Sequence, residues 1–94
     1  LHASRLMTLD CAARMDAGVS VKTESAVAKV FVSEALYRVA DRAAQLMGAL
    51  GMSEDAQVSL ILRELRPFRI YDGTSKLHRA TLGRRMLSAS ARGA

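Results

Sequence analysis

Between Gly18 and Gly48 the chain contains no glycine and no proline. Apolar residues recur through this stretch at helical spacing, at Val27, Phe31, Ala35, Val39, Ala43 and Leu46. This pattern predicts one long helix from near Val21 to about Leu50, which would be roughly 40 Å long at 1.5 Å per residue. The hydrophobic half of the chain is mainly Ala, Leu, Val and Met, with no Trp. This composition is typical of packed helices rather than sheets, so the predicted class is all-α.

Three shorter helices are expected around the long one. Their boundaries are marked by residues that commonly stop or start helices, namely Gly18, Ser53, Pro67 and the pair Thr74-Ser75. The expected ranges are 1–17, 53–66 and 74–87, followed by a small and polar tail over 88–94. No internal repeat is found, so residues 1–94 are expected to form a single domain.

Cysteine, histidine and apolar content exclude several classes of protein. Cys11 is the only cysteine, so an intrachain disulfide is excluded and a reduced, cytoplasmic setting is expected. His2 and His78 have no other ligand at metal-binding spacing, so no metal site is expected. Charged residues interrupt the apolar runs well short of the roughly 20 residues of a membrane span. We therefore expect no association with a membrane.

The net charge of +5 is concentrated in the last third of the chain. Residues 63–94 carry eight Lys or Arg against two Asp or Glu, whereas residues 1–62 are nearly balanced. Such a cluster is suited to an anionic partner, for example a nucleotide, a CoA phosphate or nucleic acid. The other interpretation is a solvated or intersubunit helix face. Charge alone leaves both open.

The tract Ile70-Tyr71-Asp72-Gly73-Thr74-Ser75 places one carboxylate immediately before a helix start. An acid at a loop-to-helix junction can be directed into a cleft from a rigid scaffold, and the positive end of the helix favours an anionic or polar ligand. Asp-Gly-Thr-Ser is also ordinary turn chemistry followed by a capping hydroxyl. A second tract, Gln45-Leu46-Met47-Gly48-Ala49-Leu50-Gly51, lies upstream.

In their order and spacing the two tracts resemble those of the acyl-CoA dehydrogenase family. Its carboxy-terminal helical domain has a Gln-x-x-Gly-Gly-x-Gly tract at the end of one long helix and an Ile-Tyr-Glu-Gly-Thr-Ser tract at the start of a later one. The resemblance covers nearly the whole chain, from about Arg5 to Leu87. It implies an up-and-down helical bundle whose first helix lies upstream of Leu1. An absent helix would leave an apolar stripe of the long helix uncovered.

The resemblance implies roles for the downstream tract. It places Asp72 in the position of the base that removes the α-proton of an acyl-CoA thioester, although Glu is commoner there. Tyr71 and Gly73 would lie beside the substrate, and Thr74 and Lys76 occupy positions that contact the flavin dinucleotide in relatives. Lys76 departs from the usual Gln or Glu.

For the upstream tract, the resemblance implies contacts to the FAD of a neighbouring subunit from residues Gln45, Leu46, Met47, Gly48 and Ala49. Ala49 departs from the usual glycine. The alternative is a plain helix terminus with Gly51 as its cap.

At the level of the whole protein, the resemblance implies an FAD-dependent dehydrogenase that converts an acyl-CoA to its trans-2-enoyl form. The partners implied are the acyl-CoA substrate, an electron-transfer flavoprotein as acceptor, and further copies of the same chain in a dimer or tetramer. The alternative is a basic helical module that binds DNA or serves structurally without turnover. The carboxylate at Asp72 favours the enzyme, so nucleic acid is not the expected partner.

Overall fold

A computed structural model describes residues 1–93 of the chain, most of which are helical. The elements are α1 (His2–Asp16), α2 (Lys22–Met47), α3 (Ala49–Met52), α4 (Gln57–Leu65), the 3-10 helix η1 (Arg66–Arg69) and α5 (Ser75–Ala91). The described part contains no strand, which confirms the all-α prediction.

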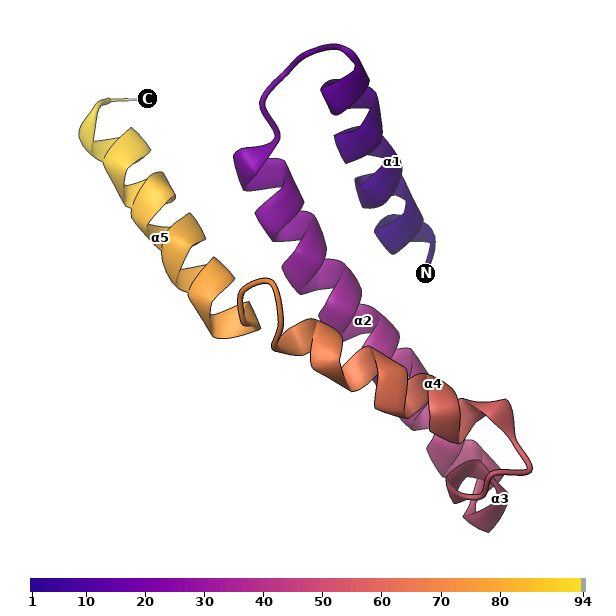
Figure 1. Cartoon of the computed structure of the whole chain (residues 1–94). Helices are drawn as coiled ribbons and strands as arrows, with labels where there is room; N and C mark the ends of the chain where they lie inside the picture. The colour runs from indigo at the N-terminus through magenta and orange to yellow at the C-terminus, as the bar shows by residue number, and fades with distance from the viewer. Residues whose placement is uncertain (94) are drawn as a thin grey trace.

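The long helix α2 is the spine against which the other helices pack (Figure 1). α1 runs antiparallel to its amino-terminal half, while α4 and then α5 return along it in the opposite direction to α2 (Figure 1). The molecule is elongated, with principal extents of 54 × 27 × 20 Å. α1 and the α4–α5 pair therefore both run opposite to α2, as expected for an up-and-down arrangement.

The long helix ends earlier than predicted. It stops at Met47 rather than about Leu50, because Gly48 adopts φ +61° and ψ −136°, and a separate short helix follows. Gly48, not Gly51, is therefore the residue that ends α2. Gly51 is buried, and a Cβ placed on it would lie 2.9 Å from the Cα of Ala44. The absent side chain at Gly51 is what lets α3 fold back onto α2.

The start of the next helix was also predicted wrongly. Ser53 does not cap it: its hydroxyl donates to the carbonyl of Leu50 at 2.8 Å and so closes α3, and α4 begins only at Gln57. The end at Leu65 agrees with the position of Pro67, but Arg66 keeps helical dihedrals because the chain continues as a 3-10 turn. α5 continues to Ala91, so the expected tail is mostly helical.

The core is built from small residues. Its buried members on α2 are Ala26, Ala28, Ser33, Ala40 and Ala44. Larger residues of the apolar stripe along α2 are exposed in part, by 40% at Phe31 and 89% at Leu46. Alanine lets neighbouring helices approach α2 closely, and the bulkier face is only partly covered by residues 1–93.

Candidate functional site

The tract around Asp72 forms a tight turn that leads directly into α5. Asp72 and Gly73 both have left-handed backbone, with φ of +53° and +92°. Thr74 then caps the helix, because its Oγ1 accepts a hydrogen bond from the backbone N–H of Leu77 at 3.0 Å. The predicted helix start at Thr74-Ser75 is confirmed. A non-glycine residue with this backbone is uncommon, so the surrounding contacts have to hold Asp72 in place.

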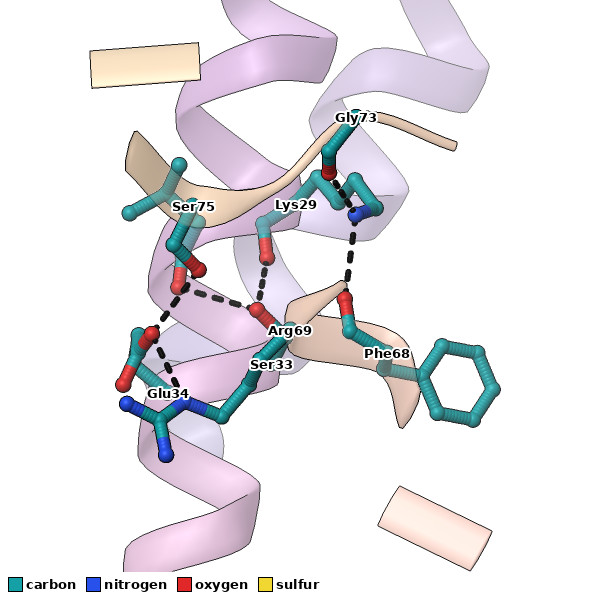
Figure 2. A network of polar contacts seen from close by, with 8 residues as sticks. Lys29, Ser33, Glu34, Phe68, Arg69, Gly73 and Ser75 are labelled. Carbon is teal, nitrogen blue, oxygen red and sulfur yellow. Dashed lines mark hydrogen bonds and ion pairs between the residues drawn. The ribbon is translucent and has the colours of Figure 1, made fainter. Parts of the chain in front are cut away.

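A lysine on α2 provides the first of these contacts (Figure 2). The ammonium group of Lys29 donates to the carbonyl oxygens of Phe68 at 3.0 Å, Tyr71 at 2.6 Å and Gly73 at 2.6 Å. An ammonium has three N–H donors, so this set uses all of them. The acceptors lie before and after Asp72, so one side chain joins α2 to both sides of the turn.

A carboxylate one turn further along α2 holds the two ends of the same loop. Oε1 of Glu34 accepts from Nε of Arg69 at 2.9 Å and from the hydroxyl of Ser75 at 2.8 Å (Figure 2). Burial by itself would raise the pKa of Glu34, but these hydrogen bonds outweigh it. With the positive charges of Arg69 and Arg79, they place the pKa below its ordinary value of 4.5. Glu34 is therefore ionised at neutral pH.

Asp72 is exposed, and the residues around it contact one another and the backbone of the turn. Nε2 of His78 lies 3.0 Å from the Asp72 carbonyl oxygen and would be 2.7 Å from a Cβ on Gly73. The ring of Tyr71 packs edge-on against Phe68 with centroids 4.9 Å apart. Partial burial and the Asp72 charge raise the pKa of Tyr71, so its phenol stays neutral. Gly73 thus serves the turn itself, since His78 occupies the space beside it.

Positive charges surround the start of α5. A hollow of about 220 Å³ is lined by Glu34, Arg66, Arg69, Ile70, Thr74, Ser75, Lys76 and Arg79. Four cations face one carboxylate there, so the hollow is suited to an anion. Two of the expected cofactor residues, Thr74 and Lys76, belong to it.

The other expected cofactor residues lie at the far end of α2. Gln45, Leu46, Met47, Gly48 and Ala49 are all exposed around the α2–α3 junction. Gln45 is sixteen residues from Lys29, which corresponds to about 24 Å along the helix. The backbone N–H of Gly48 donates to the carbonyl of Gln45 at 3.2 Å, so this amide is already hydrogen-bonded within the chain. The structure does not bring the two predicted tracts together.

Sequence reasoning missed the residues that hold the loop. Lys29 and Glu34 lie about forty positions before their partners, and His78 was considered only as a possible metal ligand. One signal was available: a Lys and a Glu stand five residues apart within the mostly small and apolar run Ala26–Ala35.

No helix among residues 1–93 is both long and apolar enough to cross a bilayer. The same residues contain no group of three or more His, Cys, Asp or Glu side chains arranged to hold a metal ion.

Comparisons with known proteins match the chain to one family. Residues 1–87 match the model described as "Acyl-CoA dehydrogenase, C-terminal domain". The very long-chain specific acyl-CoA dehydrogenase, mitochondrial, of Homo sapiens is 37% identical over 79 residues, which are 83% of this chain and 12% of that protein. The isobutyryl-CoA dehydrogenase, mitochondrial, of Dictyostelium discoideum is 37% identical over 92% of this chain and 21% of its own length.

A solved structure agrees with the sequence matches. A chain from work on the electron transferring flavoprotein of Acidaminococcus fermentans superposes with a TM-score of 0.86 and 27% identity, over 92% of this chain and 23% of that one. The chain thus spans about an eighth to a quarter of the length of these proteins. Some relatives are named as mitochondrial, so the cytoplasmic setting stays a prediction. By its sequence and its fold, this chain belongs to the acyl-CoA dehydrogenase family, as a carboxy-terminal helical domain.

Proposed function

We propose that the full-length protein is an FAD-dependent acyl-CoA dehydrogenase and that this domain supplies its base. The observation that carries the proposal is the placement of Asp72, a carboxylate on a left-handed turn held by α2 and leading into α5. The reaction removes one proton from the α-carbon and one hydride from the β-carbon of an acyl-CoA thioester. The product is the trans-2-enoyl thioester.

In this proposal Asp72 takes the α-proton. Its carboxylate is exposed on the domain surface, where a substrate bound against the other domains of the protein can reach it. Its position relies on the turn, because Asp is one methylene shorter than Glu and has less freedom to reach the carbon acid. Tyr71 and the Gly73 backbone lie beside it and would contact the acyl thioester.

The residues present suit the charge of a flavin dinucleotide. The cation-lined hollow containing Thr74, Lys76 and Arg79 would receive an anionic part of FAD, and the Gln45–Ala49 tract would contact the FAD of a neighbouring subunit. When bound, FAD supplies the hydride acceptor. The electrons would then pass to an electron-transfer flavoprotein.

The test is Asp72→Asn in the full-length protein, with reduction of the flavin followed by absorbance in single-turnover experiments. Asn keeps the size of the side chain but cannot accept the proton, so we expect reduction to slow by about a hundredfold to ten-thousandfold with substrate binding retained. Asp16→Asn, an exposed site at the end of α1, is the matched control. Reduction at the wild-type rate by the Asp72→Asn protein would show that Asp72 is only a turn residue.

A further inference from the structure

Lys29 donates more side-chain hydrogen bonds than any other polar residue among residues 1–93, and it has no direct role in the proposed chemistry. Its ammonium group donates to Phe68, Tyr71 and Gly73, all through backbone carbonyl oxygens. Its own backbone is tied down as well, because the Ser33 hydroxyl donates to the Lys29 carbonyl at 2.6 Å. The backbone of Lys29 therefore has a fixed position on α2.

The three acceptors define where Asp72 sits. The Tyr71 carbonyl belongs to the peptide unit immediately before Asp72, and the Gly73 carbonyl to the unit immediately after Gly73. Lys29 therefore holds the chain on both sides of the Asp72-Gly73 pair, while the carbonyl of Asp72 itself contacts His78. Three carbonyl oxygens that converge on one point repel each other unless a cation lies between them. The left-handed backbone of Asp72 adds strain that the surroundings must outweigh.

We propose that Lys29 is the positioning residue for Asp72: it holds the carbonyl groups of Tyr71 and Gly73, which flank the Asp72-Gly73 pair, and so sets the reach of the base. The inference rests on the proposed function of Asp72 as base. A compact ammonium is needed, because the planar guanidinium of arginine cannot direct three donors at acceptors that converge on one atom. Both the positive charge and the length of the lysine side chain are therefore needed to hold the three carbonyl oxygens.

The experiment compares Lys29→Met, Asp72→Asn and the double variant in the full-length protein. Loss of the ammonium should slow flavin reduction by about ten- to a hundredfold while the dissociation constant for acyl-CoA changes little, since Lys29 is not among the residues proposed to contact the substrate. If Lys29 acts through Asp72, the double variant should reduce flavin no more slowly than Asp72→Asn alone. Slowing effects that multiply, or a wild-type rate for Lys29→Met, would overturn the proposal. Lys22→Met, at an exposed lysine on the first turn of α2, is the control.

Chemical rescue separates positioning from simple loss of packing. In Lys29→Cys, alkylation with 2-bromoethylamine restores a side chain of lysine length that carries an ammonium, whereas iodoacetamide adds a neutral amide. We expect the first reagent to restore most of the lost rate and the second to restore little, with the alkylated wild-type protein as the background for Cys11. Equal rescue by both reagents would contradict a role for the ammonium.

Failure of this proposal can be told apart from failure of the proposed function. Hydrogen exchange at the amides of Ile70 and Tyr71, which donate to the Pro67 carbonyl at 2.8 and 3.0 Å, reports the order of the loop without any catalysis. If Asp72→Asn reduces flavin normally, the proposed function is wrong. Faster exchange in Lys29→Met would then still show that Lys29 holds the loop, and unchanged exchange would refute that as well.

Discussion

Glu34→Gln offers a quantitative test of how the Asp72 loop is held. Glu34 has only 13% of its side chain exposed and accepts from Arg69 and Ser75, which stand at the two ends of the loop. Gln keeps an oxygen acceptor but loses the charge. Hydrogen bonds to charged groups contribute about 1.5–3 kcal/mol against about 0.5–1.5 for neutral pairs, so two bonds lose about 1–2 kcal/mol after allowing for the partial exposure of Arg69. Opening of the loop should then become about five- to thirtyfold more frequent.

The pH dependence of this effect has a definite sign. The pKa of Glu34 in the folded chain lies below its ordinary value of 4.5, so the folded state favours the ionised form. Its stabilising contribution is therefore fully present above pH 4.5 and is lost as the pH falls through the folded pKa. Below that pKa the carboxyl is protonated and resembles Gln, so the difference between the two proteins should disappear.

Hydrogen exchange of the amides of Tyr71 and His78 is the suitable assay, because it reports opening of the loop and the first turn of α5. Comparing variant and wild type at the same pH cancels the intrinsic pH dependence of exchange. The control is Glu64→Gln, at an exposed position on α4, for which we expect a ratio near one throughout. The reasoning is refuted if Glu34→Gln exchanges at the wild-type rate at pH 7, or if its excess rate persists unchanged at pH 2.5.

Two further predictions concern packing. Gly51→Ala should lower the free energy of unfolding, measured by urea denaturation, by about 1–3 kcal/mol, because its Cβ would collide with the Ala44 backbone. Gly83→Ala, in a helix with open space around that position, should instead raise the free energy of unfolding by up to about 1 kcal/mol. Equal effects of the two substitutions would contradict this explanation. The 94-residue chain should self-associate in sedimentation experiments through the exposed apolar face that contains Phe31. Phe31→Ser should lower the affinity of this self-association at least about tenfold. A wild-type chain that stays monomeric at high concentration would contradict the prediction.

The sequence predicts the elements of this fold better than it predicts their faces. The absence of Gly and Pro before Gly48 and the capping hydroxyl of Thr74 are local signals, and the helices they predict are present. Which face of α2 is buried depends on what packs against it. Alanine spacing at Ala26, Ala40 and Ala44 marks the side where helices approach, while the larger apolar residues recur on the opposite side. Periodicity alone cannot distinguish these two faces.

The candidate site shows the same division between local and long-range information. The turn at Asp72-Gly73 and the helix start after it follow from neighbouring residues. The contacts from Lys29 and Glu34 join positions 35 to 44 residues apart, and no short motif records them. Only the packing of η1 and the loop against α2 brings these partners together.

The separation of the two predicted tracts has a consequence for assembly. The Asp72 loop meets α2 at Lys29, whereas the Gln45–Ala49 tract lies about 24 Å further along the same helix. A rigid helix keeps that spacing fixed, so a loop that serves one flavin places the other tract well away from the base of its own site. This supports the proposal that the tract contacts the FAD of a neighbouring subunit. In such an assembly α2 would link two sites, since its Lys29 end would orient the base of one while its Gln45 end would contact the cofactor of the other.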